Sequence, residues 1–175
     1  MKNHLIISLI ANEQQGIVSK LTRLILEAEC NVGDSRMTRL GGAFAAIMLV
    51  DGDWNQLEKL EHQLKTLAQQ EDYLLSTKQN TSSKQEGRNR LYQVKAITID
   101  HPGILQELSA FFQRSNINII NLSSEHYLAA HTATPMFSLQ MKIEIPSLHH
   151  IPLLKEKFFH LCDEMNLDST FEAIK

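Results

Sequence analysis

An internal duplication is the feature that most constrains what this 175-residue chain can fold into. The turn-like segment at 13–18 corresponds to the segment at 100–105, an offset of about 87 residues. At the same offset Leu21 corresponds to Leu108 and Asn31 to Asn118. A repeat of this length indicates one structural unit used twice, so we expect two small domains of the same architecture.

The spacing of apolar residues repeats as well. Each half contains two stripes of apolar residues at intervals of mostly three and four, which is typical of one face of an α-helix. In the first half the stripes consist of Ile17, Val18, Leu21, Leu24, Ile25 and Ala28, then of Trp54, Leu57, Leu60, Leu64 and Leu67. In the second half they consist of Ile104, Leu105, Leu108, Phe111 and Phe112, then of Leu148, Ile151, Leu154, Phe158 and Leu161.

Strand-like segments surround these stripes in the same order in each half. We predict strands at 4–11, 32–40, 43–51 and 73–78, and again at 92–99, 117–126, 135–145 and 169–174. The pair Gly41-Gly42 indicates a tight hairpin, and a connection about six residues longer takes its place at 128–133. The fold class is therefore α+β: two tandem ferredoxin-like βαββαβ units, each an antiparallel sheet with both helices on one face.

The domain boundaries follow from a polar stretch between the halves. Residues 80–89 include no large apolar side chain, so we interpret them as a linker between a first domain at 1–79 and a second at 90–175. Each domain has a thin core and a bare sheet face. We therefore expect the two units to pack together and the chain to form a homo-oligomer.

Composition and charge exclude several classes of function. The net charge is −3 and 43% of residues are hydrophobic, which favours an ordinary globular protein over one that contacts nucleic acid directly. No apolar run approaches the length of a membrane span, and no signal-peptide pattern follows Met1, so we expect a cytoplasmic protein without membrane contact. Cys30 and Cys162 are far apart in sequence and are expected to be reduced and half-buried. A modest group of Arg23, Arg36 and Arg39 is interpreted as a solvated face.

The turn Asp100-His101-Pro102-Gly103 has the most suggestive chemistry. Free N–H groups at a helix start favour an anion such as a carboxylate, and Gly103 lets a ligand approach the backbone closely. Asp100 either caps the helix or holds an ammonium group. Two readings stay open: a site for a zwitterion such as a free amino acid, or a capped helix in which Gly103 only permits tight packing.

These residues resemble a known family. The βαββαβ repeat, the Asp100–Ile104 turn and the run Asn118–Leu122 resemble the ACT domain, a module that usually binds amino acids where two copies meet. A chain of two such units is similar to the glycine cleavage system transcriptional repressor family. The first-unit turn departs from the pattern, with Glu13 in place of the usual aspartate and Gln15 in place of the usual proline.

The resemblance implies a function and a ligand site. It implies a non-enzymatic regulator that represses transcription of the glycine cleavage system by contacting a DNA-binding transcription factor, with a small amino acid, glycine, as ligand and no cofactor. The alternative is a regulatory subunit that controls a metabolic enzyme directly. The ligand-binding residues that it implies are Gly16, Asn31, Asp100, His101, Gly103, Asn118 and Asn121.

Other chemistries are poorly supported by the sequence. His149, His150, His160 and Cys162 lack the paired spacing of a zinc site and are expected to flank the apolar stripe on a solvated surface, so no metal is predicted. No P-loop, nucleophile elbow or zinc-protease motif is present. The run 123–126 contains serine, glutamate and histidine, but strand alternation separates their side chains. A catalyst on this scaffold would need a pocket with perturbed titratable groups.

Overall fold

The computed structural model describes residues 3–80 and 89–174. The chain divides into two compact units, residues 1–84 and 85–175, and each is described by itself. In the first unit the elements are β1 (Asn3–Asn12), α1 (Ile17–Glu27), β2 (Asn31–Leu40), β3 (Ala43–Gly52), α2 (Trp54–Glu71) and β4 (Leu74–Asn80). Its four strands form an antiparallel sheet in the order β2-β3-β1-β4.

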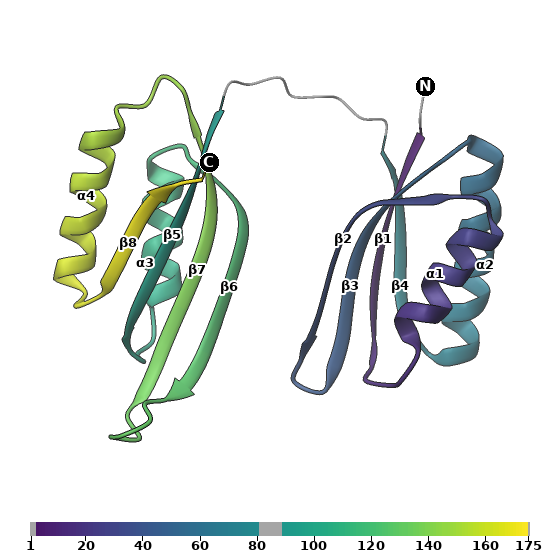
Figure 1. Cartoon of the computed structure of the whole chain (residues 1–175), viewed down its shortest axis with the longest axis horizontal. Helices are drawn as coiled ribbons and strands as arrows, with labels where there is room; N and C mark the ends of the chain where they lie inside the picture. Colours follow the sequence, from purple (N-terminus) through teal and green to yellow (C-terminus); the bar gives the residue numbers. More distant parts are fainter. Residues whose placement is uncertain (1–2, 81–88, 175) are drawn as a thin grey trace. The chain divides into compact units, whose positions relative to one another are not determined.

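The second unit repeats this topology. Its elements are β5 (Asn89–Ile99), α3 (Ile104–Arg114), β6 (Asn118–Leu128), β7 (Pro135–Pro146), α4 (Ile151–Glu164) and β8 (Asp168–Ala173). The sheet order is β6-β7-β5-β8, again antiparallel throughout. Within each unit both helices cover one face of the sheet, as the prediction from sequence required (Figure 1). The predicted α+β fold of two βαββαβ units is therefore confirmed.

Alternation along the central strands builds each core. In β1 the odd-numbered residues from Leu5 to Ala11 are buried under the helices, and in β5 the even-numbered residues from Tyr92 to Thr98 are buried in the same way. The helices contribute one stripe each. The largest fully buried side chains in the two cores are Leu5, Ile7, Leu9, Leu21, Met48, Leu57, Leu60 and Leu64, and then Leu108, Phe112, Leu139 and Phe158.

The two units differ in the length of the hairpin that connects their second and third strands. Gly41 and Gly42 have φ of 58° and 82°, so this pair forms the tight turn with two left-handed residues that suits twisted strands. The second hairpin instead connects β6 and β7 through residues 129–134. Both second strands also contain a β-bulge at corresponding positions, between Val32 and Asp34 and between Ile119 and Asn121.

Several apolar residues predicted to lie in the core are exposed. Leu148 is fully exposed because α4 begins only at Ile151, after the N-cap His150 and with a proline in its first turn. Trp54 is the first residue of α2, directly after the N-cap Asp53, and it is 57% exposed. Val18 and Leu105, one position after the first residue of α1 and of α3, are also exposed.

The boundaries also differ slightly from the prediction. Asn80 still belongs to β4 and Asn89 to β5, and the remainder of the predicted linker, residues 81–88, lies outside the described residues. In the described ranges, no helix combines the length and the apolar character needed to cross a membrane.

Candidate functional site

The second-unit turn between β5 and α3 has an unusual helix start. Gly103 is the N-cap with φ of 100°, a left-handed conformation that favours glycine. No side chain of the described residues caps α3 at this point. Since the first N–H groups of a helix have no intrahelical partner, the turn presents unpaired donors at the protein surface. A Cβ atom added at Gly103 would meet no other atom within 4 Å.

Asp100 does not cap the helix. Its backbone N–H donates to Pro135 O at 2.9 Å, which ties the turn to β7, and its carboxylate lies 3.2 Å from Nδ1 of His126 on β6. The His126 ring meets Phe137 of β7 edge-on, with ring centroids 5.1 Å apart. The reading in which Asp100 is a helix cap and Gly103 permits tight packing is therefore wrong.

These groups surround a hollow of about 380 Å³. The turn residues Asp100, His101 and Gly103 form one side, and Ser124, His126 and Phe137 from β6 and β7 form the other. His101 lies with Nδ1 only 3.2 Å from the carbonyl oxygen of its neighbour Pro102. The hollow thus combines a carboxylate, an imidazole, unpaired backbone donors and one aromatic wall.

The first-unit turn has the same plan with different chemistry. Gly16 is again the N-cap, with φ of 87°, and Glu13 forms an ion pair with Arg39 at the position that corresponds to Asp100–His126. Phe44, opposite Arg39 in the sheet, corresponds to Phe137. The hollow here is about 480 Å³ and includes Gln14 and Gln15.

Gln14 is bound on the other side of this turn. Its amide donates to the hydroxyl of Tyr73 and, at 3.4 Å, to Glu71. Glu71 also forms an ion pair with Lys20 at 2.6 Å, and this contact lowers the pKa of the Glu71 carboxyl. The first-unit turn is therefore braced by side chains, whereas the second holds an exposed aspartate–histidine pair.

The asparagines predicted for the site lie elsewhere in each unit. Asn118 pairs with Glu144 and Asn121 with Lys142, whereas His126 pairs with Phe137 eight residues further along β6. At about 3.3 Å per residue this is roughly 26 Å from Asn118. Asn31 likewise begins β2, at the end of the sheet away from Gly16. Within one unit the structure brings together Asp100, His101 and Gly103 but neither Asn118 nor Asn121.

Sequence reasoning missed His126, Ser124 and Phe137. A usable signal was present, because Arg39 and His126 are separated by the same 87 residues that separate the two turns. Counting the register back from each hairpin would then have placed an aromatic residue opposite each of these side chains.

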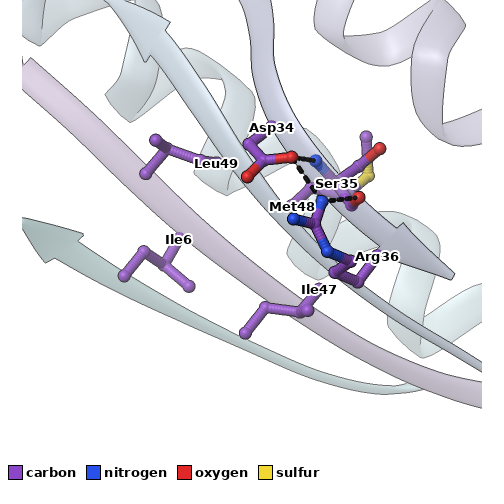
Figure 2. Close-up of a pocket in the computed structure, with 7 residues that line it drawn as sticks. All are labelled: Ile6, Asp34, Ser35, Arg36, Ile47, Met48 and Leu49. Atoms are coloured by element: carbon purple, nitrogen blue, oxygen red, sulfur yellow. Dashed lines mark hydrogen bonds and ion pairs between the residues drawn. The ribbon is translucent and has the colours of Figure 1, made fainter. Parts of the chain in front are cut away.

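The arginine group does not form a free basic patch. Arg23, Arg36 and Arg39 each face a carboxylate, with Arg36 Nη1 2.5 Å from Asp34 Oδ1. Figure 2 shows this pair with Ile6, Ile47 and Leu49. Together these residues line a hollow of about 200 Å³ in the first unit. The Arg36 guanidinium holds the pKa of Asp34 below its usual value.

The residues considered for metal or thiol chemistry have structural partners. His150 accepts a hydrogen bond from the Leu153 N–H as the N-cap of α4, and His160 lies 3.6 Å from Glu164. His149 is partly buried, with Nε2 2.9 Å from Ser115 O, and Cys162 is fully buried, so the predicted place of these two residues on a solvated surface is wrong. Burial raises the pKa of the free thiols Cys30 and Cys162, which disfavours the thiolate. No group of three or more potential metal ligands occurs in the described part of the chain.

Known proteins match this chain along most of its length. Residues 3–78 match the ACT domain family model. The glycine cleavage system transcriptional repressors of Escherichia coli (strain K12) and Shigella flexneri are each 25% identical over 173 residues, which cover 99% of this chain and 91% of the relative.

Two solved structures share the fold of the whole chain. One, provisionally named a glycine cleavage system transcriptional repressor, has a TM-score of 0.74 and 24% identity and covers 100% of this chain and 99% of its own. The other, an unknown protein from Galdieria sulphuraria, has a TM-score of 0.80 and 22% identity over 100% of both chains. Residues 3–78 thus match the ACT domain model, and over its whole length the chain resembles the glycine cleavage system transcriptional repressors.

Proposed function

We propose that the protein is a non-enzymatic regulator that senses a small amino acid in the hollow beside Gly103. The observation that carries this proposal is the juxtaposition of unpaired helix N–H donors with the carboxylate of Asp100 around open space. A free amino acid has a carboxylate for the donors and an ammonium group for Asp100.

His126 competes with the ligand for the carboxylate of Asp100. Its imidazole lies 3.2 Å from the Asp100 carboxylate, so a bound ammonium group competes with it for the same oxygens. Because the His126 side chain is 65% exposed, we expect the ligand to displace it from Asp100 at the cost of its edge-on contact with Phe137. In the first unit the guanidinium of Arg39 pairs with Glu13 in place of the imidazole, and we expect that unit to bind amino acids more weakly.

The relatives suggest what the signal controls. We propose that the chain represses the glycine cleavage system, because the relatives have that name. We further propose that it acts by contact with a DNA-binding transcription factor and that glycine relieves the repression. The net charge of −3 and the carboxylate partners of the three arginines support regulation of transcription without direct contact with DNA.

Calorimetry with the full chain tests the sensing role. Glycine and L-serine should bind, while acetate, which lacks the ammonium group, should bind at least tenfold more weakly because Asp100 then has no partner. Asp100→Asn should weaken glycine binding about tenfold, and Asp168→Asn, an exposed aspartate on β8, is the matched control. If no free amino acid binds, or if both variants behave alike, the site assignment fails.

Copurification tests the partner. The full chain used as bait in an extract of its own source cells should retain a DNA-binding transcription factor, and addition of glycine should change the amount retained. Retention of a metabolic enzyme instead would support the alternative, a regulatory subunit that acts on an enzyme directly.

A further inference from the structure

A second hollow lies between the two helices of the first unit, on the side away from the sheet. It has a volume of about 280 Å³. Its floor contains Leu24 from α1 and Leu67 and Gln63 from α2, and its walls include Lys20, Arg23 and His62. Neither the amino-acid site proposed above nor the relatives' names account for a groove at this position.

The duplicate unit fills the same place with an aromatic side chain. Leu24 corresponds to Phe111 of α3, which is 8% exposed and packs against Phe112 and Phe158 with ring centroids 5.3 and 5.7 Å apart. The smaller Leu24 is only partly buried. The hollow is therefore not a necessary consequence of this fold, because the other copy packs it closed.

The charges around the groove also differ between the copies. Leu57, Leu60 and Leu64 of α2 correspond to Ile151, Leu154 and Phe158 of α4, so the other positions of these helices can be matched. Lys20, Arg23 and His62 then correspond to Glu107, Ala110 and Glu156. At these three positions the first unit has basic side chains and the second has two glutamates and an alanine, whereas Gln63 and Thr66 correspond to Lys157 and His160.

Arg23 is the cation most available to a ligand. Its guanidinium Nε is 3.8 Å from Glu27 and the side chain is 68% exposed, whereas Lys20 is held by Glu71 at 2.6 Å. No carboxylate lines the hollow itself. An anion in the groove would therefore meet Arg23 with His62 beside it and no acidic neighbour in the lining.

Gln63 supplies the second, independent observation. Its Oε1 atom is buried and has no hydrogen-bond partner among the described residues. A buried acceptor without a donor is unfavourable, and a ligand that donates to it removes that penalty. An ammonium donor would be repelled by Arg23 and Lys20, so a neutral hydroxyl group fits this atom better.

We propose that the groove between α1 and α2 binds a small organic anion with a hydroxyl group, in which the carboxylate meets Arg23 and the hydroxyl donates to Gln63 Oε1. A hydroxy-dicarboxylate fits the positive lining and the size of the hollow. This ligand class differs from the zwitterion of the turn site, so the two proposals stand separately.

Titration of the full chain with L-malate and with succinate tests the assignment, since the two differ only in the hydroxyl group. Binding is followed by amide chemical shifts in two-dimensional NMR at constant ionic strength. We expect malate to bind about tenfold more tightly than succinate and to shift amides of α1 and α2. Gln63→Leu should lower malate affinity to the succinate level and leave succinate unchanged. Arg23→Gln should weaken both ligands about tenfold.

Two variants outside the lining serve as controls. Lys65→Gln removes a cation from α2, and Gln69→Leu removes an amide from the same helix. Both should keep wild-type affinities. Three results would overturn the proposal. Malate and succinate could bind equally, Lys65→Gln could have the same effect as Arg23→Gln, or the shifts could be confined to the Gly103 turn. The proposal would also fail if the Gln63→Leu chain were more stable to heat while the wild type bound no malate, because Gln63 would then be only a packing defect.

Discussion

Replacement of Gly103 by alanine separates backbone strain from ligand contact. An L-residue in the left-handed region costs about 1–2 kcal/mol, and φ at this position is 100°. No atom lies within 4 Å of the added Cβ, so the fold adds no steric penalty. We expect Gly103→Ala to lower the free energy of unfolding of the second unit by about 1 kcal/mol, a shift in melting temperature of about 4–8 °C for a unit of this size.

Hydrogen exchange measures this effect unit by unit. Amide protection at Phe112 in α3 should fall while protection at Leu21 in α1 stays unchanged, and Gly16→Ala should do the reverse because Gly16 has φ of 87°. Gly103→Asn should recover part of the loss, since asparagine tolerates this conformation. If asparagine were as destabilising as alanine, or if alanine were neutral, backbone conformation would not explain the glycine. If the Gly103→Ala chain folds but no longer binds glycine, the added Cβ atom clashes with the ligand.

Three further outcomes test the packing and the charges. Leu64→Ala should cost about 2–5 kcal/mol in denaturant unfolding, because Leu64 is fully buried between α2 and the sheet, and Leu67→Ala should cost less. Lys65 and then Thr77 lower the pKa of Glu61, so Glu61→Gln should destabilise the chain near neutral pH, and the difference should vanish as pH falls through the lowered pKa of Glu61. An undiminished difference at the acid end would exclude this ion pair as the cause. Iodoacetamide should modify Cys162 at least tenfold more slowly in the native chain than in urea, as measured by mass spectrometry, since burial raises the pKa of its thiol.

Most of the fold could be predicted because its determinants are local and occur twice. Alternation of apolar residues located the strands, and the glycine pair at 41–42 located the tight hairpin. The prediction failed where a periodic stripe continued past the end of its helix. Leu148 has the right spacing, but spacing does not show where a helix begins, and Pro152 and the N-cap His150 determine the start of α4.

The candidate site could be predicted only in part, for a related reason. Asp100, His101 and Gly103 are neighbours in sequence, so a single turn revealed them. His126 and Phe137 come from two strands, and their places depend on sheet register and on the length of the second hairpin. The asparagines were included because the resemblance concerns paired units, and one unit by itself separates them from the turn.

The two copies differ most at positions where the shared fold has no need of a particular residue. The turn pair is Glu13–Arg39 in one copy and Asp100–His126 in the other, although both connect the turn to the second strand. Between the helices of the first unit a hollow lies beside Leu24. In the second unit Phe111 occupies the corresponding place. A requirement of the fold alone would act equally on both copies, because their sheets and helices have the same order. The differences in charge and volume at matched positions therefore agree with the two separate sites that we propose: one for a zwitterion at the turn of the second unit and one for a hydroxy acid between the helices of the first.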